Sequence, residues 1–88
     1  MKISSILDFY SVKILLYLLQ GEARYSELLK IIVPTKSTLS YTLADLIEEN
    51  LINRMVIKSR PIQVKYVLTK KGYKVAQHFL QLKYILYE

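Results

Sequence analysis

The hydrophobic pattern of this chain changes its period after residue 50. Before that point apolar residues recur every three or four positions, as on one face of a helix, whereas in 52–58 and in 63–68 they alternate, as in a strand. Between the two alternating runs stands Ser59-Arg60-Pro61, which is typical of a turn. Two strands joined by a short loop predict a β-hairpin with Arg60-Pro61 at its tip. The fold must therefore carry one hairpin among helices.

Four helices are expected around this hairpin, over residues 4–20, 25–32, 35–49 and 70–87. Each begins near a hydroxyl side chain that can accept a hydrogen bond from the first turn: Ser4 or Ser5, Ser26, Thr35 and Thr69. Gly21 and Asn50 follow the first and third helices, where a left-handed residue commonly ends a helix. Pro34 stops the second helix because the residue before a proline is pushed out of the helical region.

This order of elements predicts the fold class α+β, mostly α, with three helices, a two-stranded β-hairpin and a C-terminal helix. Helices 25–32 and 35–49, joined by a tight turn, would form a helix-turn-helix unit, and the hairpin that follows would be its wing. Because 88 residues can build only one hydrophobic core, residues 1–88 are expected to form a single winged-helix domain.

The positive charge of the chain is concentrated in its second half. Residues 1–52 carry five Lys or Arg against six Asp or Glu, whereas residues 53–88 carry eight against one. Such asymmetry favours a polyanionic partner that approaches one side of the molecule. A solvated basic face that keeps an apolar protein in solution is the alternative, and charge alone leaves both readings open.

Several functional classes lack the residues that they need. With no cysteine and one histidine, His78, we expect no disulfide, no metal site and no cofactor, and nothing pairs a nucleophile with a base as an enzyme would require. No stretch of about 18 residues is free of charge, so no membrane span is expected. We therefore expect a cytoplasmic, nucleoid-associated protein.

Three stretches resemble the small prokaryotic winged-helix regulators of the MarR, HxlR and ArsR kinds. Residues 34–43 (PTKSTLSYTL) resemble their recognition helix, 46–54 (LIEENLINR) their exit into the first wing strand, and 67–72 (VLTKKG) their exit from the second. Asn50 stands where this pattern usually has glycine. The resemblance covers roughly residues 12–76 and implies a DNA-binding transcription regulator. The abundance of Ile, Leu, Lys and Tyr suggests an AT-rich genome, of an archaeon or an archaeal virus.

Helix 35–49 is expected to turn an apolar stripe inward and a hydroxyl-rich face outward. If Leu39, Leu43, Leu46 and Ile47 enter the core, the helical period turns Ser37, Thr38, Tyr41 and Asp45 outward, with Lys36, Ser40 and Thr42 at the margins. Short hydroxyl side chains let a helix lie deep in the major groove, and the helix N-terminus favours phosphate. Glu48 and Glu49 would be repelled by DNA, so that end should tilt away.

The predicted DNA contacts fall on this helix and on the hairpin. We expect Arg60 to enter a minor groove and Lys58 and Lys65 to contact phosphates. The alternative is that these residues do not contact DNA: Ser37 or Thr38 would only help to cap the helix, and Lys58 and Lys65 would be solvated charges. The complete predicted set is Thr35, Lys36, Ser37, Thr38, Ser40, Tyr41, Thr42, Arg54, Lys58, Arg60 and Lys65.

The last helix carries two apolar stripes, and a single core can cover only one of them. The second stripe predicts a homodimer with a two-fold axis. The residues expected in the dimer interface are Ile3, Ile6, Leu7, Tyr10, Phe79, Leu82, Tyr84 and Leu86. No small-molecule effector site is expected.

Three functions fit these features. The first is a homodimeric regulator that binds specific sites in double-stranded DNA. The second is a chromatin-like protein that coats DNA without sequence preference, and the third is a winged-helix module whose basic face binds an acidic protein.

Overall fold

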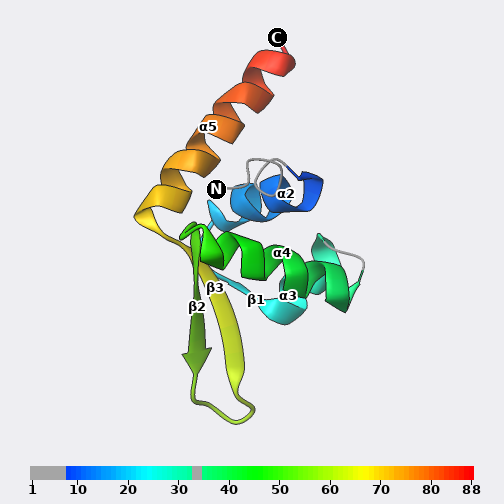
Figure 1. Cartoon of the computed structure of the whole chain (residues 1–88), viewed down its shortest axis with the longest axis vertical. Helices are drawn as coiled ribbons and strands as arrows, with labels where there is room; N and C mark the ends of the chain where they lie inside the picture. The colour runs from blue at the N-terminus through cyan, green and yellow to red at the C-terminus, as the bar shows by residue number, and fades with distance from the viewer. Residues whose placement is uncertain (1–7, 33–34) are drawn as a thin grey trace.

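Four helices and a three-stranded antiparallel sheet make up the computed structural model, which describes residues 8–32 and 35–88 (Figure 1). The fold class is confirmed, and it is that of a winged helix-turn-helix. The elements in chain order are α2 (Phe9–Leu18), β1 (Ala23–Arg24), α3 (Tyr25–Ile31), α4 (Lys36–Glu48), β2 (Ile52–Ile57), β3 (Gln63–Leu68) and α5 (Lys70–Leu86).

Strand β3 is the centre of the sheet, with β2 on one side and β1 on the other. The predicted hairpin is confirmed: β2 and β3 pair in register from Ile52 opposite Leu68 to Ile57 opposite Gln63. Strand β1 was not predicted, because two residues are too few to show a period. It pairs Ala23 with Tyr66 and so ties the start of α3 to the base of the wing.

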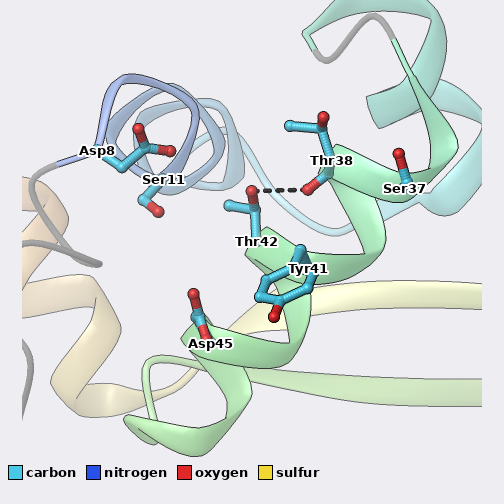
Figure 2. Close-up of a pocket in the computed structure, with 7 residues that line it drawn as sticks. All are labelled: Asp8, Ser11, Ser37, Thr38, Tyr41, Thr42 and Asp45. Atoms are coloured by element: carbon cyan, nitrogen blue, oxygen red, sulfur yellow. Dashed lines mark hydrogen bonds between the residues drawn. The ribbon is translucent and has the colours of Figure 1, made fainter.

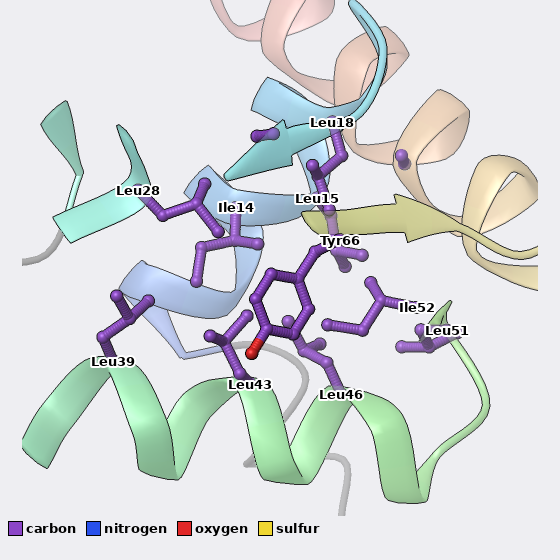
Figure 3. Packing of buried hydrophobic residues seen from close by; sticks show 12 residues of the cluster. Ile14, Leu15, Leu18, Leu28, Leu39, Leu43, Leu46, Leu51, Ile52 and Tyr66 are labelled. Carbon is purple, nitrogen blue, oxygen red and sulfur yellow. The ribbon is translucent and has the colours of Figure 1, made fainter. Parts of the chain in front are cut away.

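The hydrophobic core lies where α2, α3, α4 and the base of the sheet meet. Leu39, Leu43 and Leu46 of α4 are buried as predicted, and the ring of Tyr66 points towards them (Figure 3). Ile47 was also expected in the core but is 39% exposed, because it lies one position beyond the leucine stripe. The outward half of the hairpin extends away from this core (Figure 1).

Two predicted helix caps and two predicted left-handed residues are confirmed. The Thr35 hydroxyl accepts a hydrogen bond from the backbone N–H of Thr38, and the Thr69 hydroxyl accepts one from Gly72. Gly21 and Asn50 have φ angles of 136° and 60°.

Two predicted helix starts were wrong. The first helix was expected from residue 4, but Asp8 is extended (φ −61°, ψ 144°), so α2 begins at Phe9. Residues 4 and 5, the caps proposed there, lie outside the described part of the chain, as does Pro34. Ser26 is inside α3 rather than at its cap, because the helix already begins at Tyr25.

Helix α5 packs through its first half only. Gly72 and Ala76 are buried and Val75 and Phe79 are half-buried against the core, whereas every residue from 81 to 88 is exposed. Figure 1 shows this second half extending beyond the body, at the end opposite the wing. None of the helices in 8–32 and 35–88 is both long and apolar enough to span a membrane.

Position 72 has no room for a side chain, because a Cβ placed at Gly72 would lie 1.8 Å from the carbonyl oxygen of Leu51. Replacing glycine by alanine inside a helix normally stabilises it by about 1 kcal/mol. Here we expect Gly72→Ala to lower the free energy of unfolding by about 3 kcal/mol or to prevent folding, since backbone must move. Urea unfolding measures this. Gln81→Ala on the exposed half of α5 is the control, and a stabilised Gly72→Ala variant would show that the contact can relax freely.

Candidate nucleic-acid interface

The N-terminus of α4 presents a cluster of hydroxyl groups that lie close to one another. Thr35 caps the helix, and its hydroxyl also donates to the hydroxyl of Thr38 at 2.9 Å. The capping interpretation therefore applies to Thr35. Lys36, Ser37 and Ser40 are exposed in the first part of the same helix.

Tyr41 is the most exposed large hydrophobic side chain of α4, with 77% of its surface accessible. Its ring lies on the outer side of the helix, between Thr38 and Asp45 (Figure 2). A ring so exposed on a helix whose opposite side is buried leucine does not serve this chain's own core.

Thr42 was predicted to contact DNA, and the structure contradicts this. Its side chain is only 6% exposed, and its hydroxyl donates to the Thr38 carbonyl oxygen at 2.8 Å (Figure 2). Position 42 lies on the margin of the core stripe, where a small rotation of the helix decides between core and solvent. Here the rotation buries it.

Tyr25 connects α3 to the outer face of α4. Its hydroxyl lies 3.2 Å from the Ser40 hydroxyl and 3.5 Å from the Lys36 carbonyl oxygen. Tyr25 is half-buried against the core, so this contact fixes the angle between the two helices of the helix-turn-helix unit. No pattern in the sequence indicates this role of Tyr25.

A polar groove separates the start of α2 from α4. Asp8 and Ser11 line one side, and Tyr41, Thr42 and Asp45 line the other (Figure 2). Its two charged groups are both carboxylates, which repel phosphate. The part of the groove beside Asp8 and Asp45 is thus unsuited to a DNA backbone, whereas Ser37 and Thr38 line it at the N-terminal end of α4. Among residues 8–32 and 35–88 no group of three or more acidic, His or Cys side chains is arranged to hold a metal.

The wing supplies the cations of this surface. Arg54, Lys58 and Arg60 are exposed. Lys65 instead forms an ion pair with Glu22, with 2.9 Å between Nζ and Oε1. The hydroxyl of Ser59 donates to the Pro61 carbonyl oxygen at 2.7 Å and so closes the tip on itself.

Lys71 has a structural role at the far end of α4. Its ammonium group donates to the Glu49 carbonyl oxygen at 3.0 Å, at the helix C-terminus, where a cation is favoured. It is therefore not free to extend the basic surface of the wing.

A hydrogen bond between Tyr17 of α2 and Glu27 of α3 holds these two helices together. The Tyr17 hydroxyl donates to the Glu27 carboxylate, and this hydrogen bond is the main reason why the pKa of Tyr17 is raised from 10.0. A raised pKa stabilises the folded protein fully at any pH below the pKa that the tyrosine has in the unfolded chain. This stabilisation is lost only as the pH rises through the pKa that the tyrosine has in the folded protein. The contact is thus insensitive to pH near neutrality.

The amino-acid sequence matches one family of regulators. The model of the HxlR-like helix-turn-helix family matches residues 6–86, nearly the whole chain. The chain belongs to this family. It is thus a DNA-binding transcription regulator, and its family and structural neighbours are regulators rather than enzymes.

Solved structures agree with this HxlR-like fold. The candidate transcriptional regulator ytfH of Salmonella typhimurium is 26% identical, with a TM-score of 0.82 over 92% of this chain and 73% of that one. The redox regulator HypR in its oxidised form is 25% identical, with a TM-score of 0.83 over 92% and 84%. A transcriptional regulator homologue from Pyrococcus horikoshii OT3, 22% identical, shares the fold with a TM-score of 0.84 over 98% and 88%. No curated protein sequence matches significantly.

Because Thr42 is buried and Tyr41 is exposed, substitutions at these two positions should affect duplex affinity differently. We expect Thr42→Val to change duplex affinity by less than about twofold, and stability by about 1 kcal/mol, because one buried hydrogen bond is lost. Tyr41→Ala, next to it but exposed, should lower affinity about tenfold. Fluorescence anisotropy with a labelled duplex measures both. Equal losses would show that Thr42 turns outward on DNA.

Proposed function

We propose that this HxlR-like chain is a homodimer that binds specific sites in double-stranded DNA, with residues 1–88 forming one winged-helix domain. The observation that carries the proposal is the exposed Tyr41 on a hydroxyl-rich helix face, with the basic wing on the same molecule. Such a face and wing can reach one duplex together.

In this proposal the N-terminal half of α4 lies in the major groove. Lys36, Ser37 and Ser40 are small or flexible enough to allow close approach, and Tyr41 reaches base edges or a phosphate. Thr35 contributes through the helix N-terminus that it caps, where phosphate is favoured, and the hydroxyl of Thr38 accepts a hydrogen bond from that of Thr35. The carboxylates of Asp8 and Asp45 bound this surface on the α2 side.

The wing lies on the adjacent minor groove and its backbone. Arg60 at the tip enters the minor groove, whose negative potential attracts a guanidinium more strongly where the groove is narrow. Lys58 contacts a phosphate. Lys65 can join only by leaving Glu22, which costs little because a partly exposed ion pair is worth about 0.2–1 kcal/mol.

The exposed end of α5 supports a dimer. Leu82, Tyr84, Ile85, Leu86 and Tyr87 are each more than half exposed, which is costly for a helix end that stands alone. Of the other proposed interface residues, Tyr10 and Phe79 are half-buried against the core of their own chain, and Ile3, Ile6 and Leu7 lie outside the described residues. A two-fold dimer would set two recognition helices roughly 34 Å apart, on a pseudo-palindromic site.

Selection of duplexes from a random pool at about 150 mM salt tests sequence specificity, since non-specific binding weakens steeply with salt. We expect a pseudo-palindromic motif with wild-type protein and its loss with the Tyr41→Ala, Arg60→Ala double variant. The matched control is Thr42→Val, which should recover the same motif.

The other outcomes identify the competing functions. Tight binding without a recovered motif would contradict site-specific recognition and establish a DNA-coating protein. A wild-type protein that binds no duplex would contradict both and assign the basic face to an acidic protein partner.

The dimer has its own test. Leu82→Glu with Leu86→Glu places two carboxylates one turn apart on the exposed stripe of α5, and we expect a monomer at micromolar concentration. Gln81→Glu on the same helix is the control and should remain a dimer. Sedimentation velocity distinguishes the two species. A wild-type monomer would contradict the proposed dimer, whereas a dimer that survives both charges would show that the interface lies elsewhere.

A further inference from the structure

We propose that the groove between the wing and the start of α3 holds the DNA backbone, with Arg24 and Arg54 as phosphate ligands. The inference rests on the proposed function and deepens it, because it assigns a second DNA contact and gives Arg24 a role that the sequence analysis did not. The partner is a phosphodiester strand of the bound duplex.

The groove has a volume of about 480 Å³ and opens between two parts of the chain that are distant in sequence, residues 24–26 and residues 54–66. Arg24 and Ser26 line it from β1 and α3, Arg54 from β2, and Pro61 and Ile62 from the wing loop. Arg54 lies opposite Tyr66 in the sheet register, so the two side chains share the face of the sheet that turns towards α4.

The position of the groove follows the path of a strand of DNA. A major groove and the adjacent minor groove are separated by one sugar-phosphate backbone. If α4 lies in the major groove and the wing tip in the minor groove, that backbone must cross between them. The concavity between the wing and α3 lies there, because Tyr25, which also lines it, bonds to Ser40 on the outer face of α4.

The charge of the groove selects for phosphate. Its lining carries two guanidinium groups and no carboxylate, whereas the groove on the other side of α4 carries Asp8 and Asp45 and no cation. Within the described ranges, no carboxylate lies within 4.0 Å of Arg24 or Arg54, since the ion pair found there joins Lys65 to Glu22. Both guanidiniums can therefore turn to an incoming phosphate without breaking an ion pair.

The apolar part of the lining fits the rest of the strand. Pro61 and Ile62 are exposed, and Ile62 has 68% of its surface accessible. A deoxyribose presents carbon atoms between its phosphates, so a groove lined by both cations and an aliphatic side chain matches the alternation of the backbone. A site for a free inorganic anion would not need the aliphatic wall.

The test measures how duplex affinity depends on salt. Each phosphate contact contributes about 0.9 to the slope of log K against log salt. We expect Arg24→Gln and Arg54→Gln each to reduce the slope by about 0.9 and the affinity roughly tenfold at low salt. Lys30→Gln, an exposed cation at the other end of α3, is the control and should leave the slope unchanged. Thermal unfolding confirms that each variant is folded.

A duplex in which one phosphate is made neutral shows which phosphate Arg24 contacts. In a duplex with a single methylphosphonate at the phosphate facing Arg24, the wild type and Arg24→Gln should bind equally, because the partner has already been removed. Two results would overturn this inference alone. The first is a slope of log K against log salt that is the same for Arg24→Gln and for a wild type that binds DNA. The second is that the affinity losses from Arg24→Gln and from the methylphosphonate add at every position of the methylphosphonate. A wild type that binds no duplex would overturn the proposed function and the inference with it.

Discussion

The leucine stripe of α4 determines the orientation of the surfaces that are proposed to face DNA. Leu39, Leu43 and Leu46 pack into one core with Ile14 of α2 and Tyr66 of β3. Burying three leucines contributes several kcal/mol, about 1.5–3 for each side chain, so the helix cannot rotate about its axis at an acceptable cost. Tyr41 therefore stays outside and Thr42 inside. The same core fixes the base of the wing, because Leu51 and Ile52 belong to it and lead directly into β2.

Much of the fold could be predicted from the sequence because its signals are local. The period change after residue 50, the caps at Thr35 and Thr69, and the left-handed Asn50 each depend on a few neighbouring residues. Strand β1 could not be predicted, because Ala23 and Arg24 form a strand only through pairing with Tyr66 and Lys65, some 40 positions later. Apolar spacing alone predicted a first helix that includes Asp8, but Asp8 is extended in the structure.

The candidate site was harder to predict, because its composition depends on where elements meet. Periodicity correctly turned Tyr41 outward but could not resolve Thr42, which lies at the boundary between the two faces. Lys65 looked like a free wing cation until the fold brought Glu22 beside it. Arg24 gave no signal at all, since it enters a shared groove with Arg54 only after β1 has joined the sheet. A charged residue next to a short strand is the feature that sequence reading would have to consider.

The two surfaces proposed for function lie at opposite ends of an elongated molecule, 46 Å long and about half as wide. The wing forms one end and the apolar half of α5 the other (Figure 1). A dimer that buries the α5 end would leave α4 and the wing of each copy uncovered, and so would not have to break in order to bind DNA. It would also couple the spacing of the two recognition helices to the direction of α5. That direction depends on the close contact of Gly72 with Leu51, at the corner where α4 leads into the wing. The packing of one glycine thus bears on the geometry of the whole DNA-binding assembly.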